Sequence, residues 1–274
     1  MNAEDFNLLK GILKERSGLA LSEDKHYLLE SRLMPVARKL GMAGLDDLIR
    51  AIRTDRKETL LRDVTEAMTT NESYFFRDNL PFDQFRDLTL PTMLEARSSV
   101  RRIRIWSAAC STGQEPYSLA MILKEMTVKL AGWRVEIVAT DISNETLEKA
   151  RVGLYSQFEV QRGLPIQYLM KNFMQVDEMW QIDPSIRAMV TFKQFNLLDS
   201  FTSLGAFDIV FCRNVLIYFE SETKRQVFDK LSRCMPKDGM LYLGGAETVL
   251  GVTDSFAPIQ GQRGVYRLVE QTPQ

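Results

Sequence analysis

The chain has 274 residues, 45% of them hydrophobic and 26% charged, and its 35 basic and 36 acidic residues leave a formal charge of −1. This length suits one large domain or a small domain joined to a medium one, and the balanced charge gives no general attraction to nucleic acid or to an anionic membrane. The composition also excludes a zinc site and a nucleophile–histidine triad, because the candidate ligands are too few and lack the required spacing; they are His26, Cys110, Cys212 and Cys234.

Signals for export or membrane insertion are missing from the sequence. The first residues contain no basic region followed by an apolar one, and no run of about 18 apolar residues occurs. Three cysteines are too few for a dense disulfide framework. We therefore expect a cytoplasmic protein without membrane insertion.

The first part of the chain, residues 1–75, predicts helices only. Apolar residues recur at helical spacing in a first helix; they are Phe6, Leu9, Ile12 and Leu13. Gly18 stands where a C-cap glycine belongs, and Asp24 is expected to cap a second helix that bends at Pro35 and stops near Gly41. Shorter helices are expected over 46–53 and 57–68, so this part forms an all-α domain.

From about residue 100 the pattern changes to short apolar strands that alternate with helices, after a linker helix region over 76–99. Strands are expected over 103–108, 135–140, 207–212 and 240–243, and helices over 115–130, 144–150 and 222–234. Alternation of this kind predicts an α/β domain over 100–274 with a parallel, doubly wound, Rossmann-like sheet. The runs at 240–244 and 264–269 are expected to pair as an antiparallel edge.

One stretch interrupts the alternation. After a helix over 165–173, residues 174–182 follow a period closer to two, residues 183–185 suit a turn, and 189–195 suit a second strand. We expect a small β-hairpin insert over 174–195 that provides a platform for a partner. An edge extension of the main sheet explains the same pattern.

The exits of the first two strands carry features that suit a nucleoside cofactor, since ligands of such sheets bind at the carboxyl ends of the strands. Small residues and Gly113 follow the first strand, and Asp141 follows the second, where a carboxylate can accept hydrogen bonds from a ribose. The loop lacks the glycine fingerprint for pyrophosphate and a Walker lysine, which favours a phosphate-poor nucleoside such as S-adenosylmethionine. Alternatively, Gly113 only forms a turn and Asp141 caps a helix together with Ser143.

Two further segments hold polar residues at a candidate site. Arg213 and Asn214 follow a buried strand directly, and Tyr218 stands close behind them, although a half-buried core aromatic is the alternative for Tyr218. Upstream, Phe75 and Phe76 precede Arg77, whose planar guanidinium could orient a carboxylate. An ordinary linker with a surface pair between Arg77 and Asp78 is the alternative. Cys110 and Cys212 lie next to these loops without a histidine and are expected to be packing residues.

Four motifs together resemble the chemotaxis-receptor methyltransferases of the CheR family, over essentially the whole chain and in the family order. They are Thr-Asn-x-Ser-x-Phe-Phe-Arg-Asp at 70–78, Ala-Cys-Ser-Thr-Gly-Gln-Glu-Pro-Tyr-Ser at 109–118, Ala-Thr-Asp-Ile-Ser at 139–143 and Cys-Arg-Asn-Val-Leu-Ile-Tyr-Phe at 212–219. The chain departs from the family pattern at Ser73 (usually Thr), Ala109 (usually Gly) and Gln114 (usually Glu).

The resemblance implies a protein-glutamate O-methyltransferase that uses S-adenosylmethionine, releases S-adenosylhomocysteine and needs no metal. Its cofactor-binding positions would be Asn71, Ser73, Arg77, Glu115, Asp141, Asn196, Leu197, Arg213 and Asn214. Arg77 and Tyr218 would position the substrate carboxylate. The implied substrates are methyl-accepting chemotaxis receptors. The enzyme would be a cytoplasmic monomer that associates with membrane receptor arrays.

Residues 31–57 hold seven basic residues against three acidic ones, a local surplus suited to an acidic helix bundle. The expected receptor-docking face includes Arg32, Arg38, Lys39 and Arg53, and a solvated helix face is the alternative. The glycine-free turn at 182–186 favours recognition without a peptide tether. A nucleic-acid methyltransferase would need a basic track, which is absent. A module that only binds would be favoured by lost site residues, whereas this chain keeps them; they are Arg77, Asp141, Asn214 and Tyr218.

Overall fold

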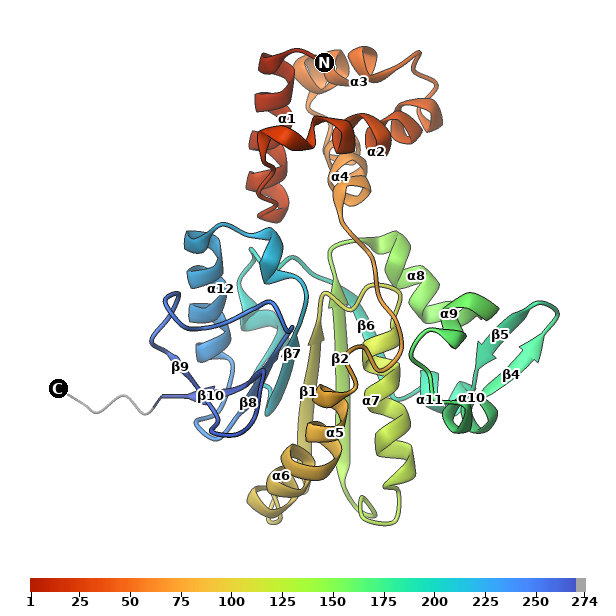
Figure 1. Cartoon of the computed structure of the whole chain (residues 1–274), viewed down its shortest axis with the longest axis vertical. Coiled ribbons are helices and arrows are strands. Elements are labelled where there is room, and N and C mark those ends of the chain that lie inside the picture. Colours follow the sequence, from red (N-terminus) through yellow and green to blue (C-terminus); the bar gives the residue numbers. More distant parts are fainter. Residues whose placement is uncertain (270–274) are drawn as a thin grey trace. The chain divides into compact units, whose positions relative to one another are not determined.

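The computed structural model describes residues 1–269, which form two compact units (Figure 1). The helical unit comprises residues 1–70 and 218–223, and the α/β unit comprises the other described residues. The division at 70/71 places the predicted linker region 76–99 and residues 71–75 within the α/β unit.

The helical unit is built from four α-helices and a short 3₁₀ turn, in agreement with the predicted all-α domain. Its elements are α1 (Ala3–Ser17), η1 (Glu23–Lys25), α2 (His26–Lys39), α3 (Leu45–Asp55) and α4 (Glu58–Met68). Gly18 ends α1 with a φ of 75°, as predicted for a C-cap. The prediction for Asp24 is wrong: it lies inside η1, which runs directly into α2 and leaves Lys25 at the N-cap position.

A segment from much later in the chain, residues 218–223, completes the helical unit. Leu19 and Phe219 form an antiparallel bridge, and the N–H of Ala20 donates to the carbonyl of Tyr218 over 2.8 Å. Lys14 and Glu220 form an ion pair of 2.7 Å. Tyr218 is thus held through its backbone by the residues that follow α1.

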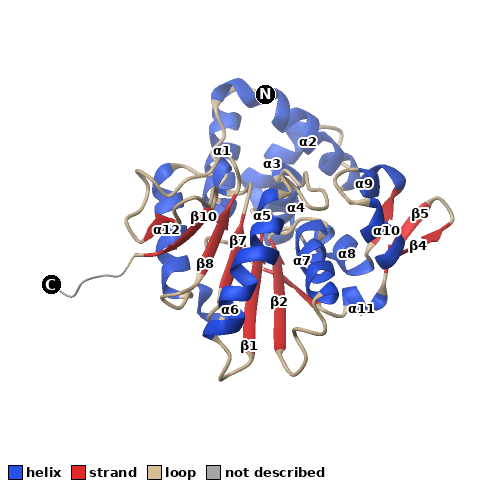
Figure 2. Ribbon diagram, turned by 60° about the horizontal axis from the view of Figure 1, so that its bottom comes forward, coloured by secondary structure: helices blue, strands red, loops and turns tan. Residues whose placement is uncertain are grey.

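The α/β unit is organised around a seven-stranded sheet (Figure 2). The strands are β1 (Arg102–Ala108), β2 (Arg134–Asp141), β6 (Val190–Gln194), β7 (Ile209–Cys212), β8 (Met240–Leu243), β9 (Phe256–Pro258) and β10 (Val265–Leu268). They lie in the order β6-β2-β1-β7-β8-β10-β9, the first five parallel. The predicted antiparallel pairing of 240–244 with 264–269 is confirmed, while the edge strand β9 was not predicted.

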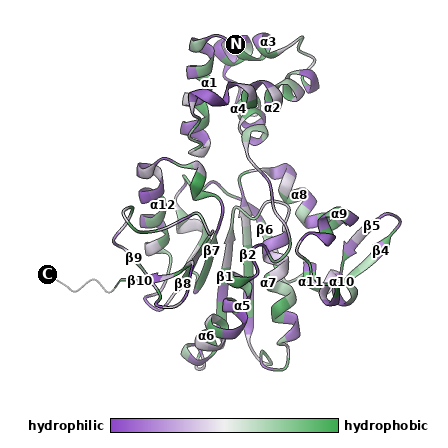
Figure 3. Ribbon diagram, viewed as in Figure 1, coloured by the Kyte–Doolittle hydropathy of each residue, from purple (hydrophilic) through white to green (hydrophobic). Residues whose placement is uncertain are grey.

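Helices connect the strands of the α/β unit, whose main sheet is doubly wound as predicted. They are α5 (Leu80–Gln84), the π-helical η2 (Phe85–Thr89), α6 (Leu90–Ala96), α7 (Gln114–Glu125), α8 (Asn144–Val152), α9 (Gln157–Gln161), α10 (Ile166–Asn172), α11 (Pro184–Arg187), η3 (Phe201–Leu204), η4 (Leu216–Tyr218) and α12 (Ser221–Arg233). Hydrophilic and hydrophobic residues follow one another along the amphipathic helices, such as α12 (Figure 3), whereas α7 is buried continuously from Pro116 to Leu123.

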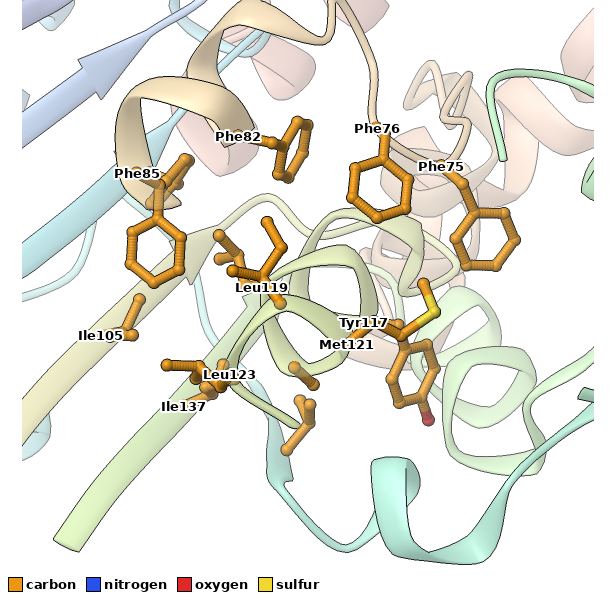
Figure 4. Packing of buried hydrophobic residues seen from close by; sticks show 14 of the residues in the cluster. Phe75, Phe76, Phe82, Phe85, Ile105, Tyr117, Leu119, Met121, Leu123 and Ile137 are labelled. Atoms are coloured by element: carbon orange, nitrogen blue, oxygen red, sulfur yellow. The ribbon is translucent and has the colours of Figure 1, made fainter. Parts of the chain in front are cut away.

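The main core of the α/β unit lies between the sheet and the helices α5, α6 and α7 (Figure 4). Ile105 of β1 stands between Ile137 of β2 and Ile209 of β7, and all three side chains are buried. Successive strand residues point to opposite faces, so Trp106 lies on the other side of the sheet, where it stacks on Phe207. Burial of the sheet on both sides explains its nearly continuous apolar strands.

A second, three-stranded antiparallel sheet has the order β3-β5-β4 and comprises β3 (Leu154–Ser156), β4 (Phe173–Val176) and β5 (Met179–Ile182). A hairpin is therefore present, but the predicted insert 174–195 is wrong at its C-terminal end. Residues 190–194 form β6, which pairs parallel with β2 in the main sheet. The hairpin turns at Asp177, whose φ is 53°, and the Asp-Pro-Ser run expected there begins α11, with Asp183 accepting from the N–H of Ser185.

Candidate active site

The order of the main sheet reverses between β1 and β7, because the chain proceeds from β1 to β2 on one side and from β7 to β8 on the other. Open α/β sheets bind ligands outside the carboxyl ends of the strands at such a switch point. The loops to examine are those that follow β1, β2, β6, β7 and β8. The predicted site residues of the α/β unit lie at the end of β2, at the exits of β6 and β7, at the start of α7 and in the 71–78 segment.

The loop after β1 is a tight turn with strained backbone. Ala109 and Ser111 have φ values of 54° and 52°, in the left-handed region that non-glycine residues seldom adopt. Gly113 has a φ of 93°, and a Cβ there would lie 3.0 Å from the Cβ of Ala150 and 3.1 Å from the ring of Tyr117. Glycine at this position is therefore required by the turn itself, as the alternative interpretation held.

Replacement of Ala109 by glycine is expected to stabilise the protein by about 0.5–1 kcal/mol. Glycine removes a left-handed strain of about 1–2 kcal/mol per residue and adds a smaller entropic cost in the unfolded chain. Urea unfolding of the two proteins measures the difference. Ala108→Gly is the matched control, since Ala108 lies in strand β1 and its replacement should lower stability; equal losses in both variants would contradict the strain.

Asp141 holds this loop to the exit of β2. Its Oδ2 accepts from the N–H of Ser111 over 2.8 Å and its Oδ1 from the N–H of Ser143 over 2.9 Å. Ser143, not Asp141, is the N-cap of α8 and accepts from the N–H of Thr146. Asp141 thus joins the loop after β1 to the residues that lead into α8.

Glu115 and Arg213 form a buried ion pair across the switch point. Oε1 of Glu115 accepts from the hydroxyl of Ser107 over 2.8 Å, and its Oε2 from Nη1 of Arg213 over 2.9 Å. Nη2 of Arg213 donates to Asp78 Oδ2 over 2.7 Å and to the carbonyl of Arg77 over 2.9 Å. The Arg213 side chain is only 1% exposed. Its role in this structure is to join the exit of β7 to α7 and to the 71–78 segment.

The 71–78 segment lies over the start of α7. The carbonyl of Asn71 accepts from the hydroxyl of Ser111, and the N–H of Phe76 donates to the hydroxyl of Ser118. Phe75 and Phe76 are buried on the helix side of the core, as Figure 4 shows. A Cβ on Gly163 would lie 2.2 Å from the carbonyl oxygen of Phe75, so this glycine allows the segment to approach closely.

Arg77 remains half-buried at the end of this segment, as does Ser73. Nη1 of Arg77 donates to the carbonyl of Glu72, and its guanidinium lies 5.4 Å from the ring centre of Tyr74. The guanidinium of Arg162 forms an ion pair with Glu72 and holds the pKa of that carboxyl below its ordinary value. The alternative surface pair between Arg77 and Asp78 is not formed; Asp78 pairs with Arg213 instead.

Asn196 and Leu197 follow β6 and form a closed turn. Oδ1 of Asn196 accepts from the N–H of Leu198 over 3.0 Å. Nζ of Lys230, on α12, donates to the carbonyls of Leu197 and Leu198 over 3.3 Å and 2.5 Å, and burial lowers the pKa of this lysine. The sequence analysis did not identify Lys230, because a lysine on an amphipathic helix normally faces solvent.

Three other residues considered in the sequence are buried or half-buried; they are Tyr218, Cys110 and Cys212. Tyr218 belongs to the helical unit and is half-buried. Cys110 and Cys212 are buried packing residues, as predicted, and burial raises the pKa of both thiols, so neither is a ready nucleophile.

Residues 1–269 contain no group of three or more histidine, cysteine or acidic side chains that could hold a metal ion. Within the same residues, no helix has the length and hydrophobicity needed to cross a membrane.

Glu247, which follows β8, was not among the predicted site residues. Its carboxylate accepts hydrogen bonds from the backbone of the loop after β7. The signal was present, because a carboxylate three residues beyond Gly244 follows the predicted strand 240–243. The exit rule that identified Asp141 applies equally to this strand.

Numbered along the chain, the strands of the main sheet lie in the order 3-2-1-4-5-7-6. This order, with a carboxylate at the end of the second strand and no pyrophosphate fingerprint, defines the class of Rossmann-like S-adenosylmethionine-dependent methyltransferases. The chain belongs to the CheR methyltransferase family: residues 71–265 match "CheR methyltransferase, SAM binding domain" and residues 4–69 match "CheR methyltransferase, all-alpha domain". S-adenosylmethionine is accordingly its cofactor.

Curated relatives span nearly the whole chain. Chemotaxis protein methyltransferase 1 of Pseudomonas aeruginosa is 40% identical over 265 residues, 95% of this chain and 96% of its own. Chemotaxis protein methyltransferase 1 of Vibrio cholerae is 39% identical and covers 93% and 94% of the two chains. The chemotaxis protein methyltransferase of Borreliella burgdorferi is 36% identical and covers 90% and 89%. The resemblance stated from the motifs is thereby confirmed.

Proposed function

We propose that this protein transfers the methyl group of S-adenosylmethionine to glutamate side chains in the cytoplasmic region of methyl-accepting chemotaxis receptors. The observation that carries the proposal is the switch-point arrangement in which Asp141, Glu115 and the 71–78 segment surround the exits of β1 and β2. The names of the curated relatives support a chemotaxis protein as the acceptor. The enzyme would act as a cytoplasmic monomer at receptor arrays.

The polar groups at these strand exits suit S-adenosylmethionine. S-adenosylmethionine carries a ribose diol and positive charge but no phosphate, and it supplies an electrophilic methyl group when bound. Asp141 would accept from the ribose hydroxyls, and Asn196 and Leu197 would lie on the adenine side. The other proposed cofactor-binding residues are Asn71, Ser73, Arg77, Glu115, Arg213 and Asn214. Because Arg213 is committed to Glu115 and Asp78, we assign it a mainly positioning role.

The chemistry suits a chain with a single histidine, His26, which stacks on Phe6 in the helical unit. A substrate glutamate is already ionised at neutral pH, so it needs no general base. One carboxylate oxygen forms the new C–O bond as the S–CH₃ bond breaks, and the electron pair of that bond leaves with sulfur as the neutral thioether S-adenosylhomocysteine. The protein must align the reactants and exclude water, and alignment accounts for about 7–11 kcal/mol of barrier in well-oriented pairs.

The test uses methyl-labelled S-adenosylmethionine and receptor-containing membranes of the source cell. We expect label on a receptor-sized band that mild alkali releases as methanol, as a carboxyl methyl ester requires. Label that survives alkali would indicate transfer to nitrogen or another acceptor and would contradict the glutamate assignment. Cofactor binding without transfer to any receptor of the cell would favour a binding-only module.

Arg77 and Tyr218 are proposed to orient the substrate carboxylate rather than to move a proton. We expect Arg77→Ala and Tyr218→Phe each to lower kcat about 10–100-fold, the effect of one lost hydrogen bond to a charged group. Steady-state kinetics and calorimetric titration with S-adenosylhomocysteine separate turnover from cofactor binding. Tyr27→Phe, at an exposed tyrosine of the same unit, is the control. Normal turnover in both site variants with intact cofactor binding would refute this role.

The proposed receptor-docking face on the helical unit is narrower than the charge count suggested. The Arg32 guanidinium donates to the carbonyls of Met68 and Thr69 at the end of α4, and Arg53 pairs with Asp5 over 2.6 Å. Arg38 and Lys39, at the end of α2, are exposed and form no ion pair with the part of the chain that the structure describes. We therefore assign receptor docking mainly to Arg38 and Lys39.

Charge reversal at Arg38 and Lys39 is expected to weaken receptor binding at least about tenfold at low salt and to reduce its salt dependence. Its cost to stability should stay below about 1 kcal/mol, since both side chains are exposed. Arg32→Ala should instead lower the free energy of unfolding by about 1–3 kcal/mol, because two carbonyls lose a charged donor. Receptor co-sedimentation at two salt concentrations, with thermal unfolding, measures both effects. If receptor binding is unchanged in the variant with both charges reversed, the docking role is wrong and these residues form only a solvated helix face.

A further inference from the structure

The Glu247 carboxylate connects the exits of two neighbouring strands, β7 and β8. Its Oε2 accepts from the N–H of Gly244 over 2.6 Å and of Asn214 over 2.9 Å. Its Oε1 accepts from three successive N–H groups of the loop after β7; they belong to Val215 (2.9 Å), Leu216 (2.7 Å) and Ile217 (3.3 Å). One side chain thus satisfies five backbone donors, four of which lie in a single loop.

This carboxylate is buried, with 9% of the residue exposed. Within residues 1–269 it forms no ion pair, so backbone N–H groups replace the water that it loses. Hydrogen bonds that involve a charged acceptor are about twice as strong as neutral ones. These hydrogen bonds therefore fix the backbone conformation of residues 214–217.

The held conformation is left-handed at one residue of the proposed site. Asn214 has a φ of 59°, and its N–H is one of the donors to Glu247. A Cβ on Gly244 would lie 2.7 Å from Nδ2 of Asn214 and 2.9 Å from its backbone nitrogen. The same Cβ would lie 2.9 Å from Oε2 of Glu247, so Asn214 and the Glu247 carboxylate both lie directly against the bare backbone of Gly244.

We propose that Glu247 is a positioning residue for cofactor binding, which acts by holding Asn214 and the loop after β7 in the binding conformation. The proposal rests on the proposed function, in which Asn214 binds S-adenosylmethionine. Glutamine cannot replace the carboxylate, because its amide nitrogen would point an N–H group at backbone donors. When one of the two oxygens no longer accepts, the hydrogen bonds that it received from the backbone are lost. Asn214 is then no longer held in its conformation.

The test compares Glu247→Gln with the unaltered protein, and Glu178→Gln at an exposed residue of the β4–β5 turn is the matched control. We expect the Kd for S-adenosylhomocysteine to rise about 10–100-fold in Glu247→Gln, by analogy with residues that orient metal ligands. The KM for S-adenosylmethionine should rise while kcat at saturation changes less. A merely structural loss would reduce the active fraction, lowering kcat and leaving Kd and KM unchanged.

A double-variant cycle tests the route through Asn214. If Glu247 acts by holding Asn214, the variant Asn214→Ala with Glu247→Gln should bind S-adenosylhomocysteine no more weakly than Asn214→Ala alone. Additive losses would overturn this route. The glycine pair gives a second test if Glu247→Gln does not fold: Gly244→Ala should weaken binding, whereas Gly245→Ala should not, because no atom lies within 4 Å of the Cβ position at Gly245.

The outcomes separate the two proposals. Failure of the unaltered protein to bind S-adenosylhomocysteine would count against the proposed function. Binding by the unaltered protein with the same affinity in folded Glu247→Gln, or equal effects of the two glycine variants, would overturn the role of Glu247 alone.

Discussion

Replacement of Arg213 by methionine is expected to lower the free energy of unfolding of the protein by about 3–5 kcal/mol. The Arg213 side chain is 1% exposed and that of Glu115 is 12% exposed, so methionine leaves the Glu115 carboxylate buried without its cation. Coulombic attraction lost in a desolvated site is not replaced by water. The carbonyl of Arg77 loses its donor as well, which releases the 71–78 segment from the exit of β7.

Urea unfolding followed by circular dichroism measures this effect, and a double variant identifies its cause. Arg213→Met combined with Glu115→Gln should recover part of the lost stability, because the orphaned charge is gone while the hydrogen bond from Ser107 can remain. Arg233→Ala, at a residue whose side chain is 78% exposed, should change stability by less than about 0.5 kcal/mol. A double variant less stable than Arg213→Met would show that the ion pair is not the source.

Replacement of Asp141 by asparagine is expected to raise the Kd for S-adenosylhomocysteine about 100-fold or more, equivalent to about 2.7 kcal/mol. The amide loses the charge that would strengthen hydrogen bonds from the ribose, and its nitrogen must face an N–H group of Ser111 or Ser143. One backbone donor is then unsatisfied, so stability should fall by about 1–3 kcal/mol as well. The replacement therefore affects both the loop after β1, which contains Ser111, and the loop after β2, which contains Ser143.

Calorimetric titration gives the binding effect, and thermal unfolding without ligand gives the stability effect. Asp254→Asn, at an exposed aspartate of the same unit, controls for the change in net charge. Stabilisation of the unaltered protein by saturating S-adenosylhomocysteine should be largely absent in Asp141→Asn, because a ligand stabilises only the state that binds it. Equal affinities in Asp141→Asn and the unaltered protein would exclude Asp141 from the cofactor site.

The fold was predictable where periodicity is strong and failed where elements are short. Parallel strands buried on both faces, such as β1 and β2, produce apolar runs that are easily recognised. The strands β3 and β9 have three residues each, too few for a period to appear. Asp183-Pro184-Ser185 was misinterpreted because the same residue types favour tight turns and helix N-termini, and only the pairing of Val190 with Ile137 decides between them.

The places of the candidate site residues in the fold were predictable, but their partners were not. The rule of strand exits located Asp141, Arg213 and Asn214, since it needs only the ends of strands. It could not show that Arg213 turns inward to Asp78 and Glu115, because partner choice depends on distances between segments remote in the chain. The same rule also covers Glu247, which follows β8, but it could not show the partners of that carboxylate, because its five backbone donors come together only in the folded sheet.

The pairing of residues 218–223 with the first helix also decides which fragments of this protein are useful. A fragment that begins at Asn71 would retain every strand of both sheets but would lack Leu19 and Ala20, the backbone partners of Phe219 and Tyr218. The proposed catalytic tyrosine would then sit on a segment without those contacts. The boundary between the two family domains is therefore a poor place to cut the chain for measurements of methyl transfer.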